Sequence, residues 1–199
     1  MQVALMTGRS DPSHCRPSPV QAAFLAALAS PRVRVLSTVF PWPPDDGRLA
    51  ASVPLVRASL ANALQYLGSR RAGWAARHRP GFEARVAEAP RTVLLCGSCG
   101  LELLANLDAS AATLARLHVL AFGPVARRRP PVHELLVVRG RGDRISRRGF
   151  AGDADRLVEG GHLDYLERLD TLALARSLIG RALAEVAPDE GAAARRRTP

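Results

Sequence analysis

The chain has 199 residues, a length that suits one domain of ordinary size. Hydrophobic residues make up 47% of it, which excludes an intrinsically disordered protein, and no apolar run reaches the roughly 20 residues that a membrane-spanning helix needs. The basic residues are 28 arginines and no lysine, against 18 acidic residues, so the formal net charge is +10. Such a surface attracts anionic partners. Aromatic residues are only 5% of the chain and do not alternate with the arginines, which argues against nucleic-acid binding by base stacking.

The compartment is indicated by the N-terminus and the cysteines. Residues 1–6 carry neither the basic segment nor the cleavage site of a secretory signal peptide. The chain has three cysteines, an odd number that cannot build a disulfide framework and suits a reducing environment. We therefore expect a cytoplasmic protein without a membrane span.

Apolar runs typical of strands alternate along the chain with helical patterns. From the N-terminus, the expected elements are a strand at 3–6, a helix at 20–28 behind Pro19, a strand at 33–40 and a helix at 49–67 with Pro54 near its start. Residues 68–90 are basic and irregular, with a short helix expected near 82–89. The second half continues with a strand at 92–95, helices at 101–107 and 111–117, strands at 118–122, 134–138 and 156–159, and a long helix at 163–186.

This alternation predicts the fold class. Several strands are apolar throughout, which is typical of strands covered on both faces. The pattern therefore predicts an α/β fold with a mostly parallel sheet of about six strands and helices on both faces. No repeat or linker divides the chain, so residues 1–187 are expected to form one domain, with a disordered, arginine-rich tail at 188–199.

The most informative segment joins a strand directly to a helix through small residues, in the order Cys96-Gly97-Ser98-Cys99-Gly100. A nucleophile at such a turn projects above the edge of the sheet, and the crowded turn needs small residues two positions before and after it. Here those positions hold Cys96 and Gly100, around Ser98. An alternative is that Ser98 only faces solvent or caps the helix.

Two further polar residues follow later strands. Asp143 lies in a glycine-rich turn after the strand at 134–138, and His162 follows Gly160-Gly161 after the strand at 156–159. Ser98, Asp143 and His162 thus each follow the C-terminal end of a predicted parallel strand, the edge where sites of such folds assemble. Rival acids near the histidine are Asp153, Asp155 and Asp164, whereas His118 and His133 lie in or beside strands and are expected to be structural.

The order nucleophile, acid, histidine resembles the α/β-hydrolase superfamily, and Gly160-Gly161-His162 is similar to the histidine motif of its acyl-thioesterases. The resemblance spans residues 1–186, begins at what would be the family's third strand, and replaces the family's first elbow glycine with Cys96. It implies a small, lidless serine hydrolase that cleaves or transfers an acyl group from a thioester or ester without a cofactor or metal. Ser98 would be the nucleophile, His162 the general base and Asp143 the residue that orients it.

The same resemblance implies the surroundings of the nucleophile. Backbone N–H groups of the loop at Gly8 and Arg9, and of Cys99, would form the oxyanion hole. Only eleven residues separate the strands at 118–122 and 134–138, so the pocket is expected to be open and shallow, with Arg127, Arg128 and Arg129 near its rim. His14 is a further candidate for substrate binding. The arginines would suit the phosphates of coenzyme A or an acidic carrier protein.

Three other functions stay open at this point. Cys96-Gly97-Ser98-Cys99 is also a C-x-x-C motif at a strand-to-helix junction, as in thiol-redox proteins, although no tryptophan precedes it. A zinc site built from Cys96, Cys99, His14 and Cys15 is conceivable but poorly spaced. A non-catalytic protein of hydrolase fold could instead bind an anionic partner through its arginines.

Overall fold

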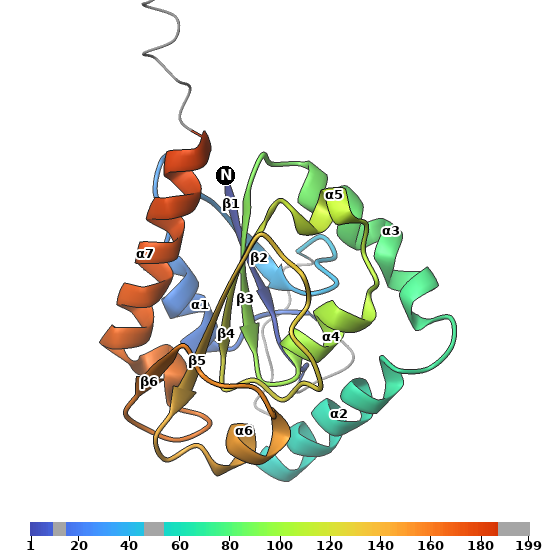
Figure 1. Ribbon diagram of the computed structural model, residues 1–199, viewed down its shortest axis with the longest axis vertical. Coiled ribbons are helices and arrows are strands. Elements are labelled where there is room, and N and C mark those ends of the chain that lie inside the picture. Colours follow the sequence, from blue (N-terminus) through green and yellow to red (C-terminus); the bar gives the residue numbers. More distant parts are fainter. Residues whose placement is uncertain (10–14, 46–53, 187–199) are drawn as a thin grey trace, which may run out of the picture.

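A computed structural model of the chain describes residues 1–9, 15–45 and 54–186 (Figure 1). Among these residues the strands are β1 (Gln2–Met6), β2 (Arg34–Val39), β3 (Thr92–Gly97), β4 (Leu117–Phe122), β5 (Glu134–Gly140) and β6 (Arg156–Val158). The helices are α1 (Pro19–Ala26), α2 (Leu55–Gly68), α3 (Trp74–Ala87), α4 (Gly100–Asn106), α5 (Ala111–Leu114), α6 (Arg144–Gly149) and α7 (Leu169–Val186), with a 3₁₀ turn at Tyr165–Glu167. None of the described helices is long and apolar enough to cross a membrane.

The strands form one parallel sheet in the order β2-β1-β3-β4-β5-β6, which confirms the predicted α/β fold. Every residue of β1, β3 and β4 is buried, as expected for central strands covered on both faces. Figure 1 shows α1 and α7 on one face and α3, α4 and α5 on the other. Two hydrophobic clusters match these layers, one including Phe24 and Leu178 and the other including Phe82 and Leu101.

The register of the sheet aligns the C-terminal ends of its central strands. Met6 of β1 pairs with Cys96 of β3, Gly97 pairs with Phe122 of β4, and Phe122 pairs with Val138 of β5. The segments that follow these strands therefore leave the sheet at one common edge.

Several element boundaries differ from the prediction. The short helix expected near 82–89 is the end of the longer α3, which continues through Pro80. Burial of Phe82 and Val86 against the sheet stabilises this helix despite the backbone hydrogen bond that proline cannot donate. Residues 111–117 divide between α5 and β4, the long last helix begins only at Leu169, and α6 was not predicted.

In the N-terminal half, the starts of the helices α1 and α2 agree with the capping and proline residues in the sequence. Ser18 caps α1 and forms a capping box with Gln21, and Pro19 occupies the first turn, as predicted. Pro54 lies at the N-cap of α2, so the helix begins directly after it at Leu55. Residues 49–53 of the predicted helix and the predicted tail at 188–199 lie outside the described residues.

Candidate active site

Ser98 lies on a sharply bent turn between β3 and α4. Its φ of 51° is in the left-handed region, which non-glycine residues rarely adopt. A Cβ on Gly100 would stand 1.9 Å from the backbone oxygen of Met6, and one on Gly97 would stand 2.6 Å from the ring of Phe122. Both positions of the turn therefore require glycine, and the close packing presents the Ser98 side chain above the edge of the sheet.

Asp143 is held at the end of β5 by the backbone around it. It is fully buried and caps α6, where its Oδ1 accepts a hydrogen bond from the Ser146 N–H at 2.8 Å. The Tyr165 hydroxyl donates to Oδ2 at 2.6 Å and itself accepts from the Gly140 N–H at 2.7 Å. The carboxylate is thus fixed from two sides before the histidine is considered.

His162 connects this carboxylate to the serine. Its Nδ1 lies 3.1 and 3.0 Å from the two oxygens of Asp143, and its Nε2 lies 3.1 Å from Ser98 Oγ. An ionised carboxylate only accepts hydrogen bonds, which assigns the proton to Nδ1 and leaves Nε2 to accept from the Ser98 hydroxyl. The structure thus brings together the three residues that follow β3, β5 and β6.

The rival acids make other contacts. Asp155 accepts a hydrogen bond from the Val137 N–H at 2.7 Å, and Asp164 accepts one from the Gly161 N–H at 2.6 Å. Asp153 is exposed, and its carbonyl oxygen accepts a hydrogen bond from Arg129. Among the described acidic residues, Asp143 alone forms a hydrogen bond with His162, and both of its oxygens take part.

The environment of Asp143 favours its charged form. Burial raises the pKa of this carboxyl, but hydrogen bonds from His162, Tyr165 and the Ser146 N–H outweigh that effect, so the pKa lies below its ordinary value. Burial, together with the hydrogen bond to Asp143, raises the pKa of Tyr165. At neutral pH Asp143 is therefore ionised and Tyr165 is a neutral donor.

A cavity of about 640 Å³ opens beside Ser98 and His162. That volume is within the usual range for a small-molecule site. Its walls are mainly apolar and come partly from α2. They include Val20, Ala58, Phe122, Val125, Ile145 and Leu163.

The predicted oxyanion-hole residues divide into two groups. Gly8 and Cys99 line the cavity and adjoin each other, since a Cβ on Gly8 would stand 2.9 Å from Cys99 Sγ. Neither backbone N–H donates a hydrogen bond to another described residue. The Arg9 N–H donates to Gln65 Oε1 at 2.8 Å, so the inclusion of Arg9 in the oxyanion hole is corrected.

The placement of Arg127 and Arg128 at the pocket rim is also corrected, because neither lines the cavity. Arg127 binds the buried carboxylate of Glu102 through its backbone N–H at 2.9 Å and its Nε at 2.9 Å. Arg128 donates to the carbonyl oxygen of Ala105 at 2.6 Å. A carboxylate buried in α4 needs cationic partners, and these arginines turn toward that helix. His14 lies outside the described residues.

The two cysteines of the C-x-x-C motif are in an environment unlike that of a reactive thiol. Both are buried and free of a disulfide. Burial raises the pKa of both thiols, that of Cys99 to about 12. A redox-active cysteine needs a lowered pKa or an exposed thiolate, so this environment disfavours the redox alternative. The zinc alternative also includes His14, which lies outside the described residues.

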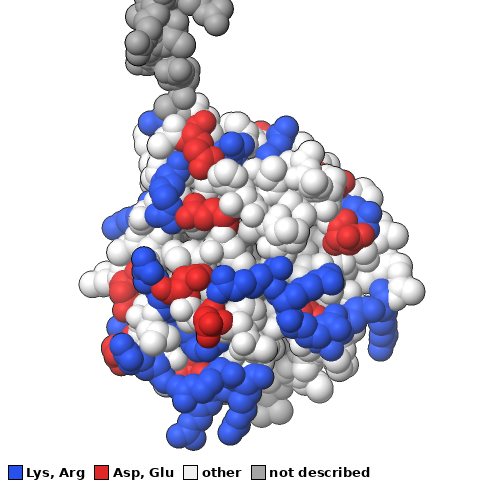
Figure 2. All heavy atoms as spheres, viewed as in Figure 1, with Lys and Arg blue, Asp and Glu red and all other residues white. Residues whose placement is uncertain are grey.

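Sequence reasoning missed three features of this region. No motif in the sequence marks Tyr165 as part of the site. The only relevant signal is the general rule that a buried tyrosine hydroxyl needs a hydrogen-bond partner. Asn62 lines the cavity, and its Oδ1 is buried without a hydrogen-bond partner among the described residues. Exposed arginines gather over α6 next to Ile145 at the cavity, at the lower edge of Figure 2; they are Arg141, Arg144, Arg147 and Arg148.

Comparison with known proteins adds no family to these observations. No protein-family model matches the chain, and no curated protein matches it at a significant level.

Proposed function

We propose that this protein is a serine hydrolase that cleaves or transfers an acyl group from a thioester or ester. The observation that carries the proposal is the continuous hydrogen-bonded chain from Ser98 Oγ through His162 to the buried, ionised Asp143. A nucleophile, a base and a group that orients the base at these distances are the arrangement that activates serine for acyl transfer. The resemblance of the motifs to the α/β-hydrolase superfamily supports the same assignment.

The reaction follows from the positions of these groups. Ser98 Oγ attacks the carbonyl carbon as its proton passes to His162 Nε2, and Asp143 stabilises the imidazolium that forms. The bond to the leaving group then breaks, and His162 gives its proton to the departing sulfur or oxygen. Water attacks the resulting acyl-serine with His162 again as base, which releases the carboxylic acid and restores Ser98.

The oxyanion of each tetrahedral intermediate would be bound by the backbone N–H groups of Gly8 and Cys99. Each such donor is worth about 3 kcal/mol of transition-state stabilisation. The mainly apolar walls suit an acyl chain, and the Asn62 side chain offers a polar contact within the same cavity.

Among acyl donors we favour thioesters of coenzyme A or of an acidic carrier protein. The support is the group of arginines on α6, which adjoins the cavity at Ile145 and would meet phosphate or carboxylate groups outside it. Arg144, Arg147 and Arg148 form no ion pair with another described residue.

Covalent labelling tests the nucleophile. A fluorophosphonate probe is expected to label the wild-type chain on Ser98, and Ser98→Ala should abolish both labelling and acyl hydrolysis. Ser59→Ala is the matched control, since Ser59 lines the same cavity on α2 and should leave labelling intact. Asp143→Asn should lower kcat by about 10⁴-fold, because the histidine loses its orienting carboxylate.

Two results would contradict the proposal. Labelling that persists in Ser98→Ala would place the nucleophile elsewhere. A wild-type chain that is folded but never labelled and never turns over an ester or thioester would instead favour a non-catalytic protein that binds an anionic partner.

A further inference from the structure

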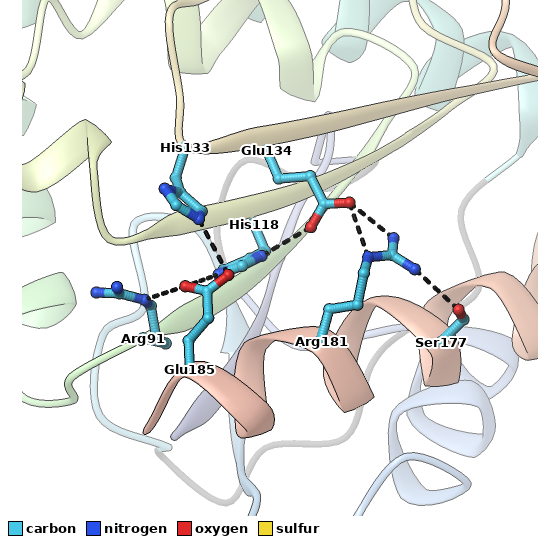
Figure 3. A network of polar contacts seen from close by, with 7 residues as sticks. All are labelled: Arg91, His118, His133, Glu134, Ser177, Arg181 and Glu185. Atoms are coloured by element: carbon cyan, nitrogen blue, oxygen red, sulfur yellow. Dashed lines mark hydrogen bonds and ion pairs between the residues drawn. The ribbon is translucent and has the colours of Figure 1, made fainter. Parts of the chain in front are cut away.

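A cluster of two histidines and two glutamates lies at the N-terminal ends of β4 and β5 (Figure 3), whereas Ser98 follows the C-terminal end of β3. His118 is near the start of β4, His133 immediately precedes β5, and Glu185 is near the end of α7. His133 Nε2 is 3.0 Å from Glu185 Oε1, and His118 Nε2 is 3.4 Å from Glu185 Oε2. One nitrogen from each histidine and one carboxylate oxygen all lie within 4.8 Å of one another.

His118 has a nitrogen without a hydrogen-bond partner. The ring is fully buried, and its Nδ1 lies 3.0 Å from Glu134 Oε2, which assigns a proton to Nδ1. Its Nε2 lies 3.4 Å from Glu185 Oε2 and forms no hydrogen bond with a described residue. A buried ring nitrogen without a hydrogen bond is unfavourable, and a bound metal ion would give this nitrogen a partner.

The third group is anionic and held in place. The Arg91 Nε donates to Glu185 Oε2 at 2.8 Å, which holds the carboxylate in position. Arg181 in turn binds Glu134 at 2.8 Å. Glu134 thus orients His118, and Arg91 orients Glu185. His133 is half exposed.

We propose that His118, His133 and Glu185 bind a divalent transition-metal ion, with zinc as the best match. Two imidazoles and a carboxylate are a common set of three protein ligands for zinc, with water in the fourth position. Ligands of a tetrahedral zinc ion stand about 3.3 Å apart, given bonds of about 2.0–2.1 Å. The separations of 3.0 and 3.4 Å from Glu185 are close to that value but involve its two different oxygens. With one oxygen of Glu185, the three ligand atoms lie within 4.8 Å of one another.

The surrounding contacts fit the same role. Glu134 accepts from the far nitrogen of His118, which is the usual arrangement for a histidine that binds metal through its other nitrogen. Glu185 and His133 are partly exposed, so an ion can enter from solvent, and the buried His118 forms the floor of the site.

The position of this site indicates what the ion would do. It joins β4, the segment before β5 and the end of α7, at the N-terminal edge of the sheet, whereas Ser98 and His162 lie at the C-terminal edge. An ion held there links the last described helix to the sheet and stabilises the fold without touching the reacting groups.

Zinc titration of the whole chain tests the proposal. After treatment with a chelator, calorimetry with zinc chloride should show one ion bound per wild-type chain. His133→Ala and Glu185→Gln should each weaken binding at least about tenfold, the loss that removal of even a second-layer partner can cause. Zinc should also raise the Tm of the wild-type chain and not that of the two variants, because a ligand that binds the native state stabilises it.

The controls are a histidine and a glutamate in other networks. His78→Ala alters a partly buried histidine of α3, and Glu88→Gln alters an exposed glutamate that, like Glu185, is paired with arginines. Both should keep the zinc affinity of the wild-type chain. His118 variants are avoided because that side chain is fully buried. The proposal is overturned if folded wild-type protein shows no saturable zinc binding, or if His133→Ala and Glu185→Gln bind zinc as tightly as the controls.

Discussion

Tyr165 shows how much a single side chain contributes to the arrangement around His162. Its hydroxyl accepts from the Gly140 N–H and donates to Asp143 Oδ2, so it joins the end of β5 to the carboxylate. A Cβ on Gly123 would stand 2.6 Å from the Tyr165 ring and 2.9 Å from Asp143 Oδ2, which shows how closely this pair is packed. Tyr165 therefore acts as a positioning residue for Asp143.

Tyr165→Phe is expected to lower kcat/KM by about tenfold, mostly through kcat, because Asp143 loses a charge-assisted hydrogen bond and orients His162 less well. Tyr66→Phe is the matched control: Tyr66 lines the same cavity, and its hydroxyl makes no hydrogen bond with a described residue. Steady-state kinetics on one acyl ester would compare the two. Equal rates for both variants would show that the Tyr165 hydroxyl does not position the site.

The same variant has a consequence for stability in acid. The hydrogen bond from Tyr165 lowers the pKa of Asp143, so its removal moves that pKa up toward the ordinary value of 3.8. A carboxyl with a lowered pKa stabilises the fold above its unfolded pKa, and this stabilisation is lost as pH falls through the folded pKa. Acid unfolding of Tyr165→Phe, followed by circular dichroism, should therefore begin at a higher pH than in the wild-type chain.

The turn between β3 and α4 is the element on which the site depends most. Ser98 is kept in the left-handed region because α4 begins directly against the backbone of β1, where Gly100 leaves room for the Met6 oxygen. Cys96, two positions before Ser98, is accommodated because its small side chain is buried in the hydrophobic cluster that includes residues of α4.

Gly100→Ala should therefore destabilise the protein by about 1–3 kcal/mol, the usual cost of forcing atoms into a filled space. Gly180→Ala is the matched control, since Gly180 lies inside α7 and a Cβ there would meet nothing. That change should stabilise the fold by up to about 1 kcal/mol, because alanine is the better helix former. Urea unfolding measures both, and a neutral Gly100→Ala would contradict the close approach described for this turn.

At the scale of the whole molecule, the arginines behind the net charge of +10 include two groups, those paired with carboxylates and those exposed to solvent. Some arginines are bound to carboxylates, as Arg70 and Arg127 are to the buried Glu102. Those on α6 are exposed beside the cavity (Figure 2), so we expect them to attract an anionic substrate toward it.

This distribution predicts how salt affects turnover. The kcat/KM for a coenzyme A thioester, which carries several negative charges, should fall as ionic strength rises, because salt screens exposed charges over about 10 Å at 0.1 M. The value for a neutral ester of the same acyl chain should change little. An Arg144→Gln, Arg148→Gln double variant should remove most of the difference between the two substrates, and an equal salt response in the wild-type chain would contradict attraction by this face.

Local sequence signals determined the alternation of strands and helices, the α/β fold, the start of α1 and the strand ends after which Ser98, Asp143 and His162 lie. These features depend on residues close together in the chain: apolar runs, capping residues and small residues at a tight turn. Only the tertiary structure decided that Asp143 rather than Asp155 meets His162, that Arg127 turns to Glu102, and that Tyr165 completes the carboxylate's hydrogen bonds. It alone brings His118 to Glu185 as well, across 67 positions of the chain. Strand order and register set these contacts, because they place residues distant in sequence at the same edge of the sheet, and no local pattern encodes that proximity.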